Sequence, residues 1–402
     1  MTKTKYIYYF RGDLRSHVGI YKSWVDAAVS KGLDMQMVTF LGLKQYISQR
    51  KLIKRYSDEN IKIYIGLPSV LNALAEALYF SALCLKYENV KVHVRKRKTN
   101  VLDFLKKLFP TKLKYIFEIE GDAVSEAEFL KERPSPECNY EAFIASSDTE
   151  KEKQYDSLKK SDGVLVVTEL FKKVLIERYP ELNLHTKINV IPTGVDAALF
   201  FYDKSIRDEY RKKLGIDDRF VLTFAGNIFY SWQNIKRSLD IFNLIKNKKL
   251  FPNPFFLLLI RAQDIPLAKK FIEQAGLGET DYLLTNVPHK EVNAYFNAAD
   301  MGILLRDPHL MNEVACPGKV GEYLCSGLRV IITEKIGLYG EKVKAAEMGI
   351  VLSDFRDDTI VLEELIKSKE KTIEREKISA WAKNEFSVQS YADKYANILS
   401  GC

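Results

Sequence analysis

The sequence predicts an α/β protein with two doubly wound domains, each built on a parallel sheet. Three observations support this prediction. The chain has 402 residues, more than the roughly 250–300 residues at which a single hydrophobic core stops growing. Short apolar runs alternate with amphipathic stretches along nearly the whole chain, which is the pattern of βαβ units. A polar, charged connection at 195–217 separates two such series and marks a domain boundary.

The first series predicts an N-terminal domain, residues 1–195. Its apolar runs are short and rich in β-branched and aromatic residues, and segments of helical period separate most of them. Runs of this kind form strands that are buried on both faces of a parallel sheet. The expected strands are 5–10, 34–40, 61–66, 90–94, 115–119, 163–167 and 188–192.

The second series predicts another domain of the same type, residues 196–375. Two helical stretches within 376–402 follow without a further strand, and we expect them to pack back toward the N-terminal domain. Two such domains would place a cleft between the carboxyl ends of their sheets, where open α/β sheets bind ligands. The expected strands are 219–226, 254–260, 281–285, 300–306 and 328–333.

The composition excludes several classes of protein. Hydrophobic residues make up 47% and charged residues 28% of the chain, which excludes disordered and collagen-like proteins. Five cysteines without a CxxC pair argue against a disulfide framework or a structural zinc site and favour a reducing compartment. The longest strongly apolar run, 255–260, is far shorter than the ~20 residues of a membrane span. The N-terminus lacks a signal-peptide core, so we expect a cytoplasmic protein.

The formal net charge of +8 is concentrated in one segment, residues 91–114. Basic residues alternate there with Leu and Phe, a pattern that suits docking on an anionic membrane surface. The protein would then be peripheral on the inner face of the cell membrane. The alternative is a solvated crossover helix whose leucines face the sheet. Nucleic acid is not an expected partner, because no recognition motif accompanies the charge.

The strongest motif covers residues 317–331, between an expected strand that ends at Arg306 and the next one. It should open a helix, whose N-terminal N–H groups and partial positive charge suit a phosphate or pyrophosphate. Lys319 adds a cation near that end, and Glu322 lies one turn further on the same face. A carboxylate there can accept two hydroxyls of a ribose. The alternative is an ordinary capped helix with an i,i+3 ion pair.

Residues 317–331 read P-x-K-x-x-E-Y-L-x-x-G-x-x-V-I, which resembles the nucleotide-sugar motif of the retaining glycosyltransferases of family 4. Further elements of that family follow in the same order over roughly residues 160–400. The resemblance implies the GT-B fold, with two Rossmann-like domains. The elements are 164–170 (VLVVTEL), 191–196 (IPTGVD, like the hinge I-P-N-G-V-D), Phe224 to Gly226 (F-x-G), Trp232-Gln233 (W-Q) and the closing helix, 386–399.

The resemblance implies a hexosyltransferase-type enzyme of class EC 2.4 that works in capsule or exopolysaccharide biosynthesis. Such an enzyme moves a sugar from a nucleotide diphosphate donor to a hydroxyl of a glycan or lipid-linked acceptor and retains the anomeric configuration. No cofactor or metal is expected, and the absence of a DxD triplet fits this. Arg306, Lys319 and the helix at 317–327 would hold the diphosphate, Glu322 the ribose and Glu313 the donor sugar.

Two departures from the family pattern leave other functions open. The carboxylate expected eight residues before Glu322 is replaced by Val314, and Glu313 is its nearest substitute. The family's basic pair after the F-x-G glycine corresponds to Asn227 and to one of the residues in 233–236 (Gln233, Asn234 or Lys236). Because that pair neutralises the departing diphosphate, its loss suggests a catalytically silent GT-B subunit. A sugar-nucleotide epimerase of GT-B fold is a further alternative.

The N-terminal domain contributes weaker signals. Gly19 ends a stretch, 11–19, that precedes an expected helix and would let the backbone approach a donor phosphate, although it can be a simple turn. The acidic segment 118–126 follows a strand and resembles a loop of capsule and exopolysaccharide transferases; it can also be a solvated loop. There Glu120 or Asp122 would orient or deprotonate the acceptor hydroxyl. The expected catalytic residues are Glu120, Asp122, Glu313 and Lys319, and the donor-binding residues are Gly19, Gly226, Asn227, Arg306, Pro317, Gly318, Lys319 and Glu322.

Overall fold

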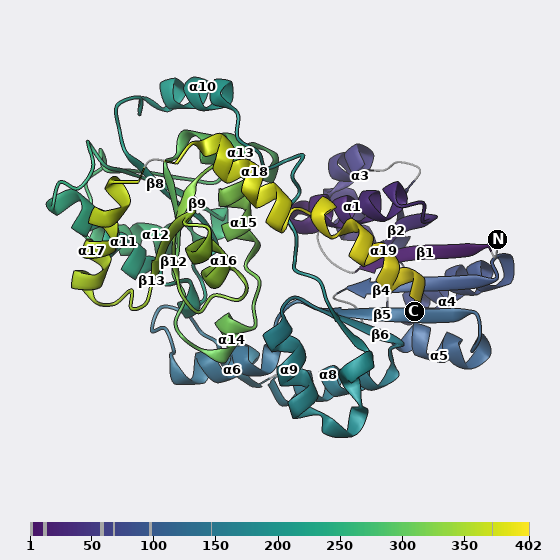
Figure 1. Ribbon diagram of the computed structural model, residues 1–402. Coiled ribbons are helices and arrows are strands. Elements are labelled where there is room, and N and C mark those ends of the chain that lie inside the picture. The colour runs from purple at the N-terminus through teal and green to yellow at the C-terminus, as the bar shows by residue number, and fades with distance from the viewer. Residues whose placement is uncertain are drawn as a thin grey trace. The chain divides into compact units, whose positions relative to one another are not determined.

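The computed structural model describes residues 3–10, 14–56, 60–66, 69–95, 99–145, 147–371 and 373–401. By its contacts the chain divides into two units, each an α/β unit around one sheet (Figure 1). Unit 1 comprises Met1–Gly121, Asp148–Gly194 and Val388–Cys402, and unit 2 comprises Asp122–Ser147 and Val195–Ser387.

Unit 1 contains a seven-stranded sheet of order β3-β2-β1-β4-β5-β6-β7, in which all pairs are parallel. The strand order reverses between β1 and β4, which marks the topological switch point of a doubly wound sheet. All seven strands expected in this part of the sequence are present. Their bounds are β1 Thr4–Phe10, β2 Met35–Gly42, β3 Ile61–Gly66, β4 Asn89–Arg95, β5 Leu113–Ile119, β6 Gly163–Val166 and β7 Ile188–Val190.

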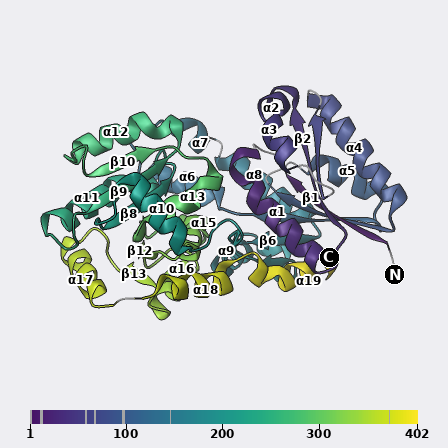
Figure 2. The same cartoon turned by 90° about the horizontal axis from the view of Figure 1, so that it is seen from above.

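Helices cover both faces of this sheet, because successive side chains of a strand point to opposite faces. Along β1, Tyr6, Tyr8 and Phe10 pack with α1 and α19, whereas Ile7 and Tyr9 pack with α4 and α5. Figure 2 shows α1 beside α19, and α4 beside α5. The helices of unit 1 are α1 Leu14–Ser30, α2 Leu43–Ser48, α3 Arg50–Tyr56, α4 Ser69–Lys86, α5 Asn100–Leu108, α8 Ser147–Lys160, α9 Glu169–Arg178 and α19 Ala392–Gly401.

Unit 2 contains a six-stranded parallel sheet of order β10-β9-β8-β11-β12-β13. The five expected strands are present. The sixth, β13, a four-residue strand at the edge of the sheet, was not predicted. The strand bounds are β8 Val221–Gly226, β9 Phe255–Ile260, β10 Tyr282–Thr285, β11 Met301–Leu304, β12 Arg329–Thr333 and β13 Gly349–Leu352.

The helices of unit 2 surround this sheet, and three of them, α6, α7 and α10, precede it in the sequence. The core of the unit is formed by β8, β9 and β11 with α11, α12 and α17. Within the described ranges, no helix of either unit combines the length and apolar character needed to cross a bilayer. The helices are α6 Ala123–Glu132, α7 Glu141–Ala145, α10 Lys204–Leu214, α11 Ile235–Asn247, α12 Ile265–Gln274, α13 Val292–Ala298, α14 Leu310–Glu313, α15 Gly318–Cys325, α16 Tyr339–Ala345, α17 Asp358–Lys369 and α18 Arg375–Phe386.

Helices α6 and α7 belong to unit 2 by their contacts, although they lie between β5 and β6 in the sequence. Phe129 and Tyr140 form a buried cluster with Met311 of α14, and Trp232 packs against it. The Tyr140 hydroxyl donates a hydrogen bond to the carbonyl of Phe229, at 2.7 Å. The domain ranges expected from the sequence stay a prediction; the division by contacts differs from them at α6, α7 and α18.

Candidate functional site

The predicted donor residues of unit 2 follow the carboxyl ends of its central strands or begin α15. Asn227 follows β8, Arg306 lies two residues after β11, and α15 leads into β12. Because β8, β11 and β12 are parallel neighbours, these segments emerge at the same edge of the sheet. The strand order reverses between β8 and β11, so this edge contains the switch point where doubly wound sheets bind ligands.

Helix α15 is held in place by Tyr323. Its hydroxyl accepts a hydrogen bond from the backbone N–H of Ala225 at 2.8 Å, which ties α15 to the end of β8. Its ring lies directly over Gly302 of β11, where a Cβ atom would come within 2.5 Å of the ring. Burial raises the pKa of Tyr323, so the hydroxyl keeps its proton. Tyr323 therefore fixes α15 against two strands, β8 and β11.

The N-terminus of α15 carries the central pair of the predicted site. Pro317 occupies the N-cap position without a side-chain cap, and Gly318 is the first helical residue. The Lys319 ammonium donates to the Glu322 carboxylate at 2.6 Å, and the two side chains are 29% and 16% exposed. This i,i+3 ion pair is present in both interpretations of the motif, as a ligand site and as an ordinary helix start.

His289, which the sequence analysis missed, is electrostatically coupled to this pair. Burial lowers the pKa of its imidazole, Glu322 raises it and Lys319 lowers it again. The ring packs edge-on against Phe200, with centroids 5.6 Å apart. A single histidine after a short strand gives no sequence signal, and only the fold reveals its neighbours.

Arg306 is buried and points toward the loop that follows β8. Its guanidinium donates to the carbonyl of Trp232 at 2.8 Å. Burial lowers the pKa of Arg306 to about 10, and Glu126 of α6 opposes this shift. The side chain thus remains a cation near neutral pH.

Two further arginines converge on Asp307, the residue after Arg306. The Asp307 carboxylate is buried and forms ion pairs with Arg133 and Arg356. Asn234 donates to the same carboxylate at 3.0 Å. Burial, and then the neighbouring Arg133, lower the pKa of Arg356. The sequence could not reveal this cluster, because its members come from α6 and from the segments after β8, β11 and β13.

Asn227, directly after Gly226, occupies the position at which the family that the sequence resembles has its first basic residue. Gly226 has a φ of +148°, a conformation that L side chains rarely adopt. No atom outside its chain neighbours lies within 4 Å of the position a Cβ would take, so the backbone is open on that side. The side-chain oxygen Oδ1 of Asn227 accepts a hydrogen bond from the side-chain amide Nε2 of Gln233 at 3.5 Å. Two neutral amides are therefore in contact here.

The two remaining predicted residues are Glu313, which has a long ion-pair contact, and Gly19, which lies inside a helix. The Glu313 carboxylate, at the end of α14, lies 3.7 Å from the Lys335 ammonium and is 27% exposed. Gly19 lies within α1, which begins at Leu14, so the expectation of a loop glycine before a helix was wrong. The helix simply starts earlier than the apolar pattern suggested. Residues 11–13 lie outside the described residues.

Glu120 is held by Arg95 at the carboxyl end of the sheet of unit 1. The Arg95 guanidinium forms ion pairs with Glu120 and, at 3.3 Å, with Glu118, and it donates to the Tyr8 hydroxyl at 3.0 Å. Arg95 is buried, whereas the Glu120 side chain keeps 23% of its surface exposed. Asp122 is fully buried at the N-cap position of α6. Of the two predicted acceptor residues, Glu120 alone is accessible.

The charge of Arg95 is maintained by its carboxylate neighbours. Burial lowers the pKa of Arg95, but Glu118 and the nearby tyrosines outweigh this and raise it overall. Glu118 also contacts His93 at 2.9 Å, and the other ring nitrogen of His93 lies 2.6 Å from the Tyr395 hydroxyl of α19. Within the basic segment 91–114, His93 and Arg95 thus face inward. Residues 96–98 lie outside the described residues.

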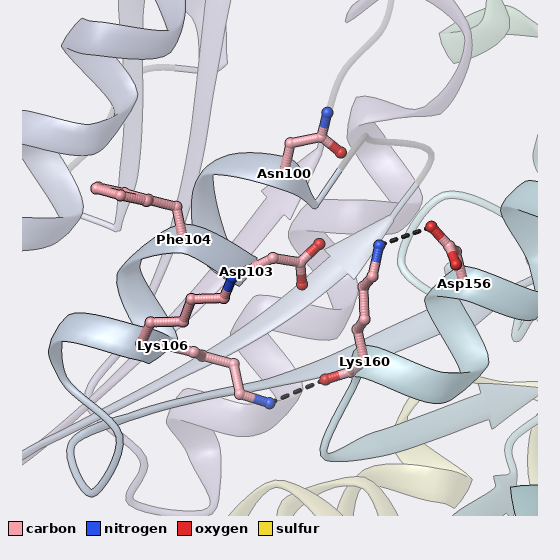
Figure 3. A pocket seen from close by; sticks show the side chains of 7 residues that line it. Asn100, Asp103, Phe104, Lys106, Asp156 and Lys160 are labelled. Carbon is pink, nitrogen blue, oxygen red and sulfur yellow. Dashed lines mark hydrogen bonds and ion pairs between the residues drawn. The ribbon is translucent and has the colours of Figure 1, made fainter.

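A cavity of about 650 Å³ lies beside this segment, between α5 and α8 of unit 1. Figure 3 shows Asp103 and Lys106 of α5 opposite Lys160 of α8. Lys106 forms an ion pair with Asp162 at 2.7 Å, and Lys160 forms one with Asp156 at 2.6 Å. The cavity is separate from the predicted donor residues. Among the described residues, no group of three or more His, Cys, Asp or Glu side chains is arranged to hold a metal ion.

Comparisons with known proteins relate the chain to glycosyltransferases through its fold. No protein-family model matches the sequence. A curated relative, "Putative glycosyltransferase YtcC" of Bacillus subtilis (strain 168), is 37% identical over 70 residues, which are 16% of this chain and 17% of that protein. The match thus covers about one sixth of the relative's length.

Solved structures match over nearly the whole chain. HepE of Anabaena in complex with UDP has a TM-score of 0.70 at 13% identity, covering 99% of this chain and 100% of that one. A glycosyltransferase from Rickettsia africae ESF-5 has a TM-score of 0.66 at 16% identity, covering 100% and 98%. WaaG, a glycosyltransferase involved in lipopolysaccharide biosynthesis, has a TM-score of 0.58 at 14% identity, covering 99% and 100%. The chain has the GT-B fold. The fold class predicted from the sequence is confirmed.

Proposed function

We propose that the protein is a glycosyltransferase that moves a sugar from a nucleotide diphosphate donor to a hydroxyl of a glycan or lipid-linked acceptor. The observation that carries the proposal is the start of α15, where an uncapped helix N-terminus lies beside the Lys319–Glu322 pair at the carboxyl edge of a GT-B sheet. HepE, which has this fold, has been solved with UDP and with UDP-glucose, which supports a nucleotide-sugar ligand.

The donor would bind to unit 2. The N-terminal end of α15, which has no side-chain cap, and the Lys319 ammonium suit the diphosphate, and the open backbone at Gly226 leaves room beside it. Glu322 would accept the two ribose hydroxyls, and Glu313 would contact the donor sugar. Lys319 already contacts a carboxylate at 2.6 Å, so the arriving diphosphate would compete for the same ammonium.

Stabilisation of the departing diphosphate would come from cations rather than from a metal. The two amides at Asn227 and Gln233 supply no positive charge, so Lys319 and Arg306 take that role in our proposal. We propose a retaining, metal-independent transfer of a hexosyl group without a cofactor, with an oxocarbenium-like transition state.

The acceptor would be oriented by Glu120 of unit 1. Arg95 holds its carboxylate while leaving part of it accessible, and a carboxylate in that position can accept the proton of an attacking hydroxyl. Because Asp122 is fully buried, we assign it no contact with the acceptor. A role in polysaccharide biosynthesis, with contact between 91–114 and the inner face of an anionic membrane, completes the proposal.

The test is a transfer assay with the purified protein, radiolabelled UDP-, GDP- and dTDP-sugars and a lipid extract as the acceptor source. We expect one donor to yield labelled lipid or glycan, and Glu322→Ala to lower the yield at a donor concentration below the Kd of the wild type. Absence of transfer from every donor would overturn the proposal. Interconversion of the sugar nucleotide without transfer would show an epimerase.

One observation favours a second candidate, a catalytically silent GT-B subunit: the neutral contact between Asn227 and Gln233 in place of the basic pair. Such a subunit would bind the nucleotide without turnover. Donor binding with no transfer, by the protein alone, would support this candidate.

A further inference from the structure

The outer face of α4 is apolar along its whole length. Leu71, Leu74, Leu78 and Leu85 are between 53% and 75% exposed, and their spacing places them on one stripe of the helix. A surface helix of a globular protein normally turns polar side chains to water. In α4 the exposed stripe is instead the apolar one, over a helix of 18 residues.

The charged residues of α4 also differ from those of an ordinary surface helix, where they would lie on the exposed side. Before Lys86, its last residue, α4 contains one charged residue, Glu76, and this carboxylate is buried and accepts a hydrogen bond from Asn72 at 2.6 Å. Phe80 and Cys84 bury the opposite side of the helix against the sheet. Packing in the core therefore does not account for the exposed leucines.

Helix α5 extends this apolar surface. It packs beside α4 on the same face of the sheet (Figure 2), with Leu102 and Leu105 buried toward the strands. Phe104 and Leu108 are each 58% exposed on its outer side. Since both helices turn their buried sides to one sheet face, their exposed sides point away from it together. We call this surface the α4–α5 face, formed by Leu71, Leu74, Leu78, Leu85, Phe104 and Leu108.

The part of the sequence that forms the α4–α5 face is rich in basic residues. Residues 69–114 contain ten Lys and Arg but three Asp and Glu, which accounts for most of the net charge of +8. Of the three acidic residues, Glu76 is buried, Asp103 accepts a hydrogen bond from the Tyr115 hydroxyl at 2.5 Å, and Glu88 is exposed. Lys86 and Lys107 are exposed at the end of α4 and on α5.

The positive charge distinguishes between two possible partners of the α4–α5 face, a second copy of the chain and a lipid bilayer. A symmetric pair of copies would bring the same positive surface against itself, which is unfavourable. An anionic lipid surface complements the charge, and the boundary between headgroups and acyl chains accepts an apolar helix face. We propose that the α4–α5 face docks on an anionic lipid bilayer, with its Leu and Phe side chains at that boundary and the lysines at the lipid phosphates.

The inference deepens the membrane contact of the proposed function, because it adds the exposed leucines of α4, which precede residues 91–114, to Phe104 and Leu108 within that segment. Its test is co-sedimentation of the full chain with vesicles of phosphatidylcholine, with and without phosphatidylglycerol. We expect binding to the anionic vesicles, and at least about tenfold weaker binding of L74Q/L78Q, because the apolar anchor is lost. K86E/K107E should also bind more weakly and should remove most of the salt dependence.

The matched control is L170Q/I366Q, which changes two exposed apolar residues of α9 and α17 and should bind as the wild type does. Circular dichroism checks that each variant is folded. The proposal is overturned if the wild type does not bind anionic vesicles, or if L74Q/L78Q binds as well as the wild type. It is also overturned if light scattering shows a dimer that L74Q/L78Q dissociates, since a second copy would then occupy the face. Binding of UDP is measured in parallel, so failure of the donor site is recognised separately.

Discussion

Replacement of Glu322 by Ala separates the two interpretations of the α15 motif. In the structure the Glu322 carboxylate contacts the Lys319 ammonium at 2.6 Å, and both side chains are partly exposed. An ion pair in that setting contributes about 0–1 kcal/mol to stability. If the pair is only structural, E322A lowers the free energy of unfolding slightly and changes nothing else.

Ligand binding should change far more. A hydrogen bond to a charged acceptor contributes about 1.5–3 kcal/mol, so loss of the ribose contacts corresponds to a roughly tenfold to 150-fold higher Kd for UDP. The freed Lys319 would favour the diphosphate and hide part of this loss. The 2′-deoxy analogue of UDP resolves the difficulty, because it lacks one of the hydroxyls that Glu322 would accept.

Isothermal titration with UDP and 2′-deoxy-UDP is the assay. We expect the wild type to prefer UDP and E322A to bind the two nucleotides almost equally. The control is Glu347→Ala, which breaks another 2.6 Å ion pair of unit 2, with Lys371 at the surface, and should leave the preference unchanged. The same preference in E322A and the wild type would refute the assignment of Glu322 to the ribose.

Three further predictions concern single residues. Tyr323→Phe leaves the N–H of Ala225 without its partner and should cost about 1–3 kcal/mol in urea unfolding; unchanged stability would contradict the anchoring of α15. Burial lowers the pKa of His289 in the folded state, so the unfolded chain takes up the proton first. Stability should therefore fall as the pH drops below about 6.5 toward the lower folded pKa, and His289→Gln should flatten this fall in Tm; equal profiles would exclude the effect. Arg95→Met removes a buried partner of Glu118 and should destabilise the fold by about 3–5 kcal/mol, which chemical denaturation would test.

The strands could be predicted because a parallel sheet buries both faces and leaves continuous apolar runs. The four-residue edge strand β13 was the exception and was not predicted. The assignment of α6 and α7 to unit 2 was out of reach, since it depends on contacts such as that of Tyr140 with Phe229, 89 positions apart. Local patterns carry no information on such pairings.

The sequence also predicted some residues of the candidate site and missed others. Lys319 and Glu322 could be found because they lie on one turn of one helix, and their contact is present in the structure. His289 and the arginines around Asp307 could not, because distant segments bring them together. Arg95 is the instructive case: in the sequence it looks like one more cation of a basic surface segment, yet it is buried under two carboxylates. Whether Arg95 is exposed or buried depends on the face of the sheet toward which its side chain points, and only the structure shows this.

The most direct test of the central claim, a nucleotide-sugar site at the start of α15, is a thermal-shift panel of UDP-, GDP- and dTDP-sugars on the wild type and E322A. A ligand that binds only the folded state stabilises it by about 2.7 kcal/mol at a hundred times its Kd. The account predicts that one base raises the Tm of the wild type and that E322A loses most of the rise. No shift with any of the three, or an equal shift in E322A, would contradict it.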